Sequence, residues 1–333
     1  MVSRGKNLTI EAKIHVLRPS LALAMEIRGM VMEDIPAYTD LYNLAQSNDP
    51  EFRRMTPKNT ENHIFQKSTD TLEGYFVALE SGLMVAAGNS RYTPKSDGKA
   101  SVSLLVLPEY LGTDVELYVF QSIVEHLRSK GVKVVSMRAN TDNVAKTNML
   151  ERLGFHRTEY QRHHMERSTH GVPEPVLPGG YLLRNARMPD EMERLLETIN
   201  AAYSTREGFG VQTLEEISKF PYLTDPEFLP GLFVVERIED GKIVGMVGSQ
   251  IEHMYNLEHG RKRGSSYSLM VIPSERGKGI GRALMQSSLR WLAEKGMEVA
   301  YLGVNHQNPD ALHLYKSLRY ELVGIWQGYE RNL

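Results

Sequence analysis

The fold is decided by the stretch Leu269-Met-Val-Ile-Pro-Ser-Glu-Arg-Gly-Lys-Gly-Ile-Gly-Arg-Ala283. It opens with apolar residues that are typical of a buried strand, and three alternating glycines follow before a segment of helical spacing. Glycines between a strand and a helix let the main chain approach a ligand and turn its free N–H groups toward an anion at the positive end of the helix dipole. Because Arg276, Lys278 and Arg282 add positive charge, the stretch predicts a cradle for a pyrophosphate group.

Three other kinds of glycine-rich turn compete with this interpretation. A dinucleotide fingerprint needs its third glycine one position later than Gly281, and a P-loop needs a Gly-Lys-Ser/Thr run that is absent here. The third alternative is a tight strand-to-helix turn that binds no ligand, and the loop alone does not exclude it. The residues on either side of the loop must therefore decide.

The pattern around the loop predicts a mixed sheet flanked by helices. Apolar residues at helical spacing predict a helix over residues 189–202. Two β-rich runs, residues 232–238 and 243–251, are joined through Asp240-Gly241, which predicts a hairpin. The other predicted elements are a strand over 266–272, a helix over 281–295, a strand over 299–304 and a short helix over 309–318.

An internal repeat extends this architecture to the first half of the chain. Residues 305–320 align with residues 140–155 at an offset of 305 minus 140, or 165. The same offset pairs Val271 with Val106 and Pro273 with Pro108 without a gap. So many coincidences in one register indicate that the fold is built twice.

Domain boundaries follow from the repeat and from one change in composition. Residues 168–180 hold three prolines and three glycines, as an extended linker does. The sequence therefore predicts an N-terminal extension (residues 1–24), a first domain (25–167), the linker (168–180) and a second domain (181–333).

Composition excludes several classes of function. A chain of 333 residues with 41% apolar and 24% charged residues is typical of a globular protein with two cores. The net charge of −2 predicts neither nucleic-acid binding nor membrane binding. The absence of cysteine rules out an acyl-cysteine intermediate and thiolate metal sites, and no apolar run reaches membrane-spanning length, so we expect a cytoplasmic protein without a metal.

At these residues the second half resembles the GNAT acetyltransferases. The family pattern R/Q-x-x-G-x-G/A after a strand L-x-V-x-P is matched by residues 269–281. A second pattern, N-x-x-A-x-x-x-Y followed by an aromatic residue, is matched by Asn308, Ala311, Tyr315 and Tyr320. The resemblance covers about residues 180–333 and reaches residues 25–167 through the repeat. The tandem arrangement is also similar to that of mycothiol synthases, although no residue identifies that substrate.

The resemblance implies an α/β fold, with two tandem domains that each contain a mixed, largely antiparallel sheet. It implies acetyl-CoA between two splayed parallel strands, with Asn308 on the pantetheine arm and Tyr315 near the sulfur. Tyrosine suits the role of general acid, because a phenol can give a proton to a leaving thiolate without being ionised at neutral pH; alternatively, Tyr315 only packs its helix onto the sheet. The implied cofactor-binding residues are Leu269, Met270, Val271, Arg276, Gly277, Lys278, Gly279, Ile280, Gly281, Arg282, Ala283, Asn308 and Tyr315.

Direct transfer to an amine also needs a base, and the sequence does not identify one. The strand before the cradle lacks the glutamate that some family members carry there, so Glu252 and His253 at the end of the preceding strand are the candidates. A solvated loop pair without catalytic function is the alternative. The acceptor, the length of the acyl chain and the choice between monomer and homodimer stay open.

The first half lacks the same motifs. At the cradle position it reads Leu111-Gly-Thr-Asp-Val-Glu116, with acidic residues that would repel pyrophosphate, and Leu150 stands where Tyr315 stands in the second half. We therefore expect one catalytic half, which acetylates a primary amine from acetyl-CoA. The alternative is a sensor that binds acetyl-CoA, or a module that binds a partner, without turnover.

Overall fold

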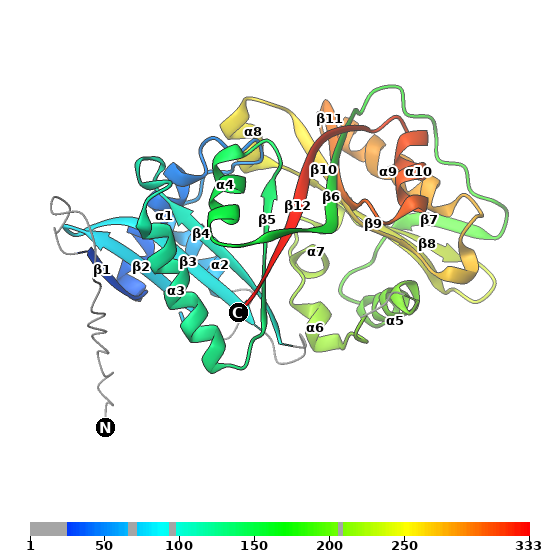
Figure 1. Ribbon diagram of the computed structural model, residues 1–333. Coiled ribbons are helices and arrows are strands. Elements are labelled where there is room, and N and C mark those ends of the chain that lie inside the picture. Colours follow the sequence, from blue (N-terminus) through cyan, green and yellow to red (C-terminus); the bar gives the residue numbers. More distant parts are fainter. Residues whose placement is uncertain (1–24, 66–71, 93–97, 206–208) are drawn as a thin grey trace.

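The computed structural model describes residues 25–65, 72–92, 98–205 and 209–333. One mixed twelve-stranded sheet runs through the molecule, and the helices lie against both halves of it (Figure 1). The strand order is β1-β2-β3-β4-β5-β12-β6-β11-β10-β9-β8-β7. Read inward from one edge, the order is the first five strands of the N-terminal half and then β12. Read inward from the other edge, it is the first five strands of the C-terminal half and then β6. The repeat in the sequence thus appears as two similar halves that meet at the β12/β6 pair. The extension expected for residues 1–24 lies outside the described residues.

The N-terminal half begins with a strand and two α-helices, continues with three consecutive strands, and then alternates α-helices and strands. Its strands are β1 (Met25–Gly29), β2 (Tyr75–Glu80), β3 (Leu83–Tyr92), β4 (Lys99–Val106), β5 (Val134–Asn140) and β6 (His156–Ser168). Its α-helices are α1 (Ile35–Ala45), α2 (Pro57–Phe65), α3 (Asp114–Ser129) and α4 (Val144–Arg152). Short 3-10 turns lie at Met32–Asp34 and Pro108–Tyr110.

The C-terminal half repeats the plan and adds short helices. Its strands are β7 (Tyr181–Asn185), β8 (Phe233–Arg237), β9 (Ile243–Ile251), β10 (Arg263–Val271), β11 (Val299–Asn305) and β12 (Glu321–Asn332). Its α-helices are α5 (Met192–Tyr203), α6 (Leu214–Ser218), α7 (Pro221–Thr224), α8 (His253–His259), α9 (Ile280–Glu294) and α10 (Pro309–Ser317). The expected mixed sheet is confirmed, and each predicted element of this half is found within three residues of its expected ends.

The last strand of each half pairs with strands of the other half. The linear ranges 25–167 and 181–333 therefore each end in a strand that completes the opposite part of the sheet. β6 pairs antiparallel with β11, and β12 pairs antiparallel with β5. β6 and β12 also pair with each other at the centre of the sheet. Pairing partners depend on contacts between distant segments, so the sequence pattern located a repeat without showing that its final strands are exchanged.

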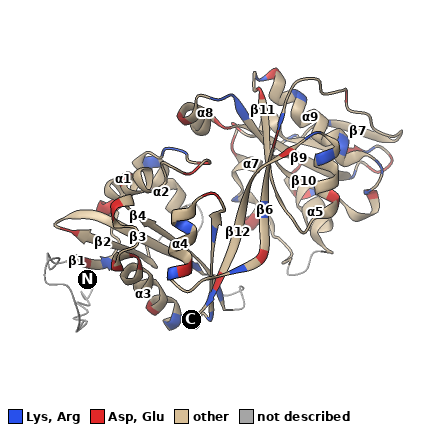
Figure 2. Ribbon diagram, turned by 45° about the horizontal axis from the view of Figure 1, so that its top comes forward, with Lys and Arg blue, Asp and Glu red and all other residues tan. Residues whose placement is uncertain are grey.

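Each half has its own apolar core. In the N-terminal half, α3 buries Val119, Phe120 and Ile123 against the sheet. In the C-terminal half, Leu284, Leu289 and other residues of α9 pack on one face of the sheet, and α5 to α7 cover a separate cluster. Basic and acidic residues are interspersed over both halves (Figure 2).

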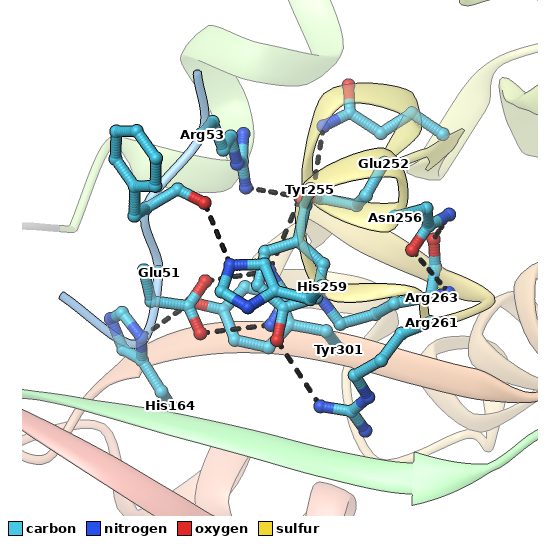
Figure 3. A network of polar contacts seen from close by, with 12 residues as sticks. Glu51, Arg53, His164, Glu252, Tyr255, Asn256, His259, Arg261, Arg263 and Tyr301 are labelled. Atoms are coloured by element: carbon cyan, nitrogen blue, oxygen red, sulfur yellow. Dashed lines mark hydrogen bonds and ion pairs between the residues drawn. The ribbon is translucent and has the colours of Figure 1, made fainter. Parts of the chain in front are cut away.

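A buried ion network joins the halves (Figure 3). The side chain of Arg263, at the start of β10, is fully buried and binds Glu51 through both terminal nitrogens, at 2.9 and 2.7 Å. Its guanidinium lies between the rings of Tyr255 and Tyr301, 3.2 and 4.1 Å from their centroids. Arg53 pairs with Glu252 in the same network. Because Glu51 and Arg53 come from the N-terminal half, the network fixes the two halves against each other.

Candidate active site

A gap between two parallel strands forms the centre of the C-terminal site. β10 and β11 pair over only three positions, from Arg263 with Val299 to Ser265 with Tyr301. Beyond them the strands separate, and the register of β10 against β9 shifts between Tyr267 and Met270. One edge of residues 266–271 therefore faces the gap, and hydrogen-bonding groups of the main chain are available there.

Val271 presents its main chain to this gap. The N–H of Ile272 donates to Val244 of the neighbouring segment, so the N–H of Val271 points the opposite way, because successive N–H groups alternate along a strand. The Val271 carbonyl accepts a hydrogen bond from Arg276 Nε at 3.2 Å. The Met270 side chain is buried in the cluster under α5, and Leu269 is partly buried. The main chain of β10 can thus receive an extended ligand along this edge.

The glycine loop that follows has the geometry of an anion cradle. Gly277 and Gly279 have φ of +78° and +84°, a region that other residues occupy only with strain. A Cβ at either position would meet nothing within 4 Å, so both glycines face open space. Gly279 is the N-cap of α9, and the N–H groups of Ile280, Gly281 and Arg282 in the first turn have no acceptor within the helix. The buried side chains of Ile280 and Ala283 anchor this turn in the core.

The three basic residues around the cradle hold the loop in place. Lys278 Nζ contacts buried Glu275 at 2.8 Å, and Arg237 contacts the same carboxylate at 2.8 Å. Hydrogen bonds from Lys278 and Tyr181 lower the pKa of Glu275.

The other two basic residues reach across to neighbouring elements. Arg276 donates to the Ala202 carbonyl at 2.8 Å, which links the loop to the end of α5. Arg282 donates to Ser317 Oγ at 2.7 Å, which links α9 to α10. All three side chains thus make protein contacts in addition to the charge that they bring to the cradle.

Tyr315 lies on α10 beside the apolar core of this half. Its side chain is 9% exposed, and its ring meets that of Tyr320 edge to face at 5.8 Å. Its hydroxyl makes no hydrogen bond to any described residue. Burial raises the pKa of Tyr315 to about 12, so the phenol keeps its proton at neutral pH.

Asn308 has a structural task that the sequence analysis did not assign. It is the N-cap of α10, and its side chain accepts the N–H of Ala311 at 3.1 Å. Asn143 caps α4 in the same way, with the N–H of Lys146 at 3.0 Å. Since the half without a cradle keeps this asparagine, helix capping is sufficient to explain its presence in both repeats.

Neither candidate base stands near the cradle. Glu252 is buried and paired with Arg53 and Arg263, so it is not the solvated loop residue considered from the sequence. Its main-chain N–H binds the carbonyl of Arg263, seven residues along β10 from Met270, which is about 23 Å in a strand. His253 is exposed and lies 3.5 Å from Glu227. Glu252 stabilises the join between the halves.

A group of aromatic side chains lies on the other side of β10, and the sequence analysis did not select it. Tyr222 meets Tyr267 edge to face at 5.3 Å, and Tyr203 packs against Phe209 at 5.4 Å. The Tyr267 hydroxyl is buried without a hydrogen-bond partner among the described residues. These rings come from α5, α7, β10 and the loop after α5, and their sequence spacing carried no signal that they would meet.

In the N-terminal half the corresponding cradle is filled by the protein itself. The N–H of Gly112 donates to the buried carboxylate of Glu116 at 2.7 Å. Arg152 binds both oxygens of the same carboxylate at 2.8 Å. An internal anion thus occupies the place that a pyrophosphate would take.

The described residues offer neither a metal-binding cluster nor a membrane-spanning helix. They contain no group of three or more histidine, aspartate or glutamate side chains placed to hold a metal ion. They also contain no helix long and apolar enough to cross a membrane.

Comparison with known sequences gives a family match within the C-terminal half. Residues 192–320 match the sequence model of the acetyltransferase (GNAT) family. The mycothiol acetyltransferase of Segniliparus rotundus is 33% identical over 150 residues, which cover 44% of this chain and 54% of that protein. That of Stackebrandtia nassauensis is 26% identical over 229 residues, covering 66% and 70%. The chain spans about half the length of several curated relatives with this name.

Comparison with solved structures identifies the fold of the whole chain. A tandem GNAT protein from the clavulanic acid biosynthesis pathway superimposes with a TM-score of 0.72 over 93% of this chain and 98% of that one, at 14% identity. The likeness therefore covers both halves. The resemblance inferred from the glycine loop is confirmed, as a GNAT domain within a tandem GNAT fold.

Proposed function

We propose that the C-terminal half, which matches the acetyltransferase (GNAT) family, transfers an acetyl group from acetyl-CoA to a primary amine. The observation that carries the proposal is the combination of an open glycine cradle at the start of α9 with the gap between β10 and β11. The cradle suits a pyrophosphate, and the free edge of β10 suits the pantetheine arm that follows it. The filled cradle of the N-terminal half leaves one such site per chain.

The reaction proceeds by direct attack of the amine on the thioester. The main-chain N–H of Val271 faces the gap and polarises the thioester carbonyl as negative charge develops on its oxygen. A bond forms between the amine nitrogen and the carbonyl carbon as the bond from carbon to sulfur breaks, and Tyr315 gives its proton to the leaving sulfur. The proton that the nitrogen loses passes to solvent, from which Tyr315 is protonated again. Because burial keeps this phenol protonated, it is ready to act as the acid across the neutral pH range.

The acceptor enters from the side of β10 that carries Tyr203, Tyr222 and Tyr267. This aromatic surface favours a small molecule with an apolar or ring-shaped body next to its amine. Because several relatives are named mycothiol acetyltransferases, the acceptor of those enzymes is one of the compounds to test.

The proposal is tested by incubating the full chain with acetyl-CoA and a panel of primary amines that includes the mycothiol acetyltransferase acceptor. Free thiol release and the mass of the acetylated amine are measured. Amine-dependent release with a matching product supports acetyl transfer. Tight binding of acetyl-CoA without turnover on any amine would instead favour a sensor.

A further inference from the structure

A second cavity lies in the N-terminal half, away from the site described above. It has a volume of about 300 Å³ and is enclosed by α1, α2, β3, β4 and α4. Polar side chains that line it include Tyr38, Tyr42, His63, Arg91 and Lys146, and apolar ones include Ile64 and Leu105. None of the described residues that line it is acidic. The volume is at the lower end of the range for small-molecule pockets.

This cavity has the same structural origin as the gap in the active half. β4 and β5 pair only from Lys99 with Val134 to Ser101 with Ser136, and then separate. Val102, Ser103 and Leu105 of β4 line the cavity beyond that point. The first half has therefore kept the opening while losing the cradle beside it, where Glu116 takes the anion position. A ligand of this cavity needs no nucleotide tail.

Lys146 distinguishes this cavity from the gap between β10 and β11 in the C-terminal half. By the repeat, Lys146 takes the place of Ala311, so a long cationic side chain replaces a methyl group at the gap. Its ammonium lies 5.9 Å from the centroid of the Trp326 ring and has no ion pair or hydrogen bond among the described residues. Burial lowers the pKa of Lys146, and the charge of Asp49, which forms no ion pair with Lys146, opposes this effect.

Lys146 is partly buried, lines a cavity without acidic lining, and has no ion pair or hydrogen bond among the described residues, so its ammonium offers a site for an anion. Arg91, whose guanidinium donates to His63 Nε2 at 3.2 Å, adds a second cation at its edge. A single ammonium beside phenols, with apolar walls around it, matches a carboxylate on a small organic body better than a phosphate, which favours several arginines or a row of N–H groups.

We propose that this cavity binds a small organic carboxylate, whose anionic group pairs with Lys146 and whose apolar body packs between Tyr38, Ile64 and Leu105. The degenerate half then has a ligand of its own, different in class from acetyl-CoA. Trp326 of β12 lies next to Lys146, and its ring also stacks on His164 of β6 at 5.8 Å.

The test uses the full chain with saturating CoA, which occupies the C-terminal cleft without turnover. Acetate, benzoate, phenylacetate and 4-hydroxybenzoate are titrated by calorimetry, each beside its neutral amide and beside inorganic phosphate. In parallel, acetic anhydride labelling read by mass spectrometry reports how far each compound protects Lys146. We expect at least one carboxylate to bind and to protect Lys146, while its amide does neither.

Variants assign the binding to the cavity. Lys146→Met should weaken carboxylate binding by roughly tenfold or more, because a charge-assisted contact is lost. Lys130→Met should leave binding unchanged, because Lys130 pairs with Glu73 on the surface of the same half. If Lys146→Met does not fold, protection of Lys146 in the wild-type chain still decides the matter. The proposal is overturned if amides bind as well as acids, if phosphate protects Lys146 better than any carboxylate, or if no carboxylate binds at millimolar concentration.

Discussion

Tyr315 is the residue on which the proposed chemistry depends most. Its ring packs on Tyr320, whereas its hydroxyl has no partner among the described residues, so the polar group is left to a ligand. The raised pKa agrees with a proton donor and excludes a role as a base at neutral pH.

Replacing Tyr315 with phenylalanine should lower kcat by roughly 10²–10³ fold, since a general acid typically contributes that much. The dissociation constant for acetyl-CoA should stay within about threefold of the wild-type value, because the ring and its packing remain. Steady-state kinetics and calorimetry measure the two effects. Tyr320→Phe is the matched control and should keep wild-type kcat. An equal loss in both variants would reduce Tyr315 to a packing residue.

His164 makes stability depend on pH. Burial, followed by the charges of Arg162 and Arg263, lowers the pKa of His164 from its ordinary value of 6.5 to about 4. Between these values the unfolded chain binds a proton that the folded chain does not. Stability is therefore complete above pH 6.5 and is lost as the pH falls toward 4.

Urea unfolding at pH 7 and pH 5 should show this loss. The wild-type chain should lose on the order of 2 kcal/mol more than His164→Gln over this interval, because each unit of pKa shift corresponds to about 1.4 kcal/mol. His313→Gln, at an exposed position on α10, should behave as the wild type does. A wild-type slope equal to that of His164→Gln would mean that His164 titrates normally in the folded chain.

Among the elements, the N-terminus of α9 shows the clearest difference between the two halves. Gly279 opens α9 onto free space, whereas Glu116 closes the start of α3 with its own carboxylate. Both helices have the same place in the repeat, so the difference between them lies in the few residues before the first turn. The cradle is thus a property of one element and not of the fold.

Gly279→Ala should weaken acetyl-CoA binding by roughly tenfold or more, because the new methyl group enters the space of the anion and disturbs N–H donors. It should also destabilise the chain by about 1–2 kcal/mol, because φ is positive. Gly296→Ala at the other end of α9 is matched, with φ of +77° and nothing within 4 Å. It should cost the same stability without loss of binding. Equal affinities in the two variants would place the pyrophosphate elsewhere.

The elements of the C-terminal half were predictable, because hydrophobic period, the Asp240-Gly241 turn and the glycine loop are local signals. The turn with positive φ at Gly277 and Gly279 was predictable for the same reason. The aromatic group around Tyr222 and Tyr267 was not, because it is assembled from separate elements. The partner of Glu252 was not either, since Arg53 lies about 200 residues away in the chain.

At the scale of the whole molecule, the exchanged strands make each half depend on the other. β12 completes the sheet of the N-terminal half and β6 completes that of the C-terminal half. The network around Arg263 adds a buried ionic contact across the same join. The repeat is visible in the sequence, whereas the exchange of the final strands depends on pairing between distant segments and is not; the twelve strands form one continuous sheet.

Separate fragments should therefore fail to fold alone. Residues 25–180 and 181–333, expressed separately, should each lack a central strand partner and show non-cooperative thermal unfolding. Expressed together, they should form a one-to-one complex with cooperative unfolding and acetyl-CoA binding. Circular dichroism and analytical ultracentrifugation measure this. A fragment that unfolds cooperatively as a monomer would contradict the dependence.

The central claim is that one half of a doubled fold binds acetyl-CoA and the other does not. Calorimetric titration of acetyl-CoA into the wild-type chain, Gly279→Asp and Gly112→Asp tests it most directly. The account predicts one site per chain, lost in Gly279→Asp and retained in Gly112→Asp. Two sites, or a site that survives in Gly279→Asp and disappears in Gly112→Asp, would contradict it.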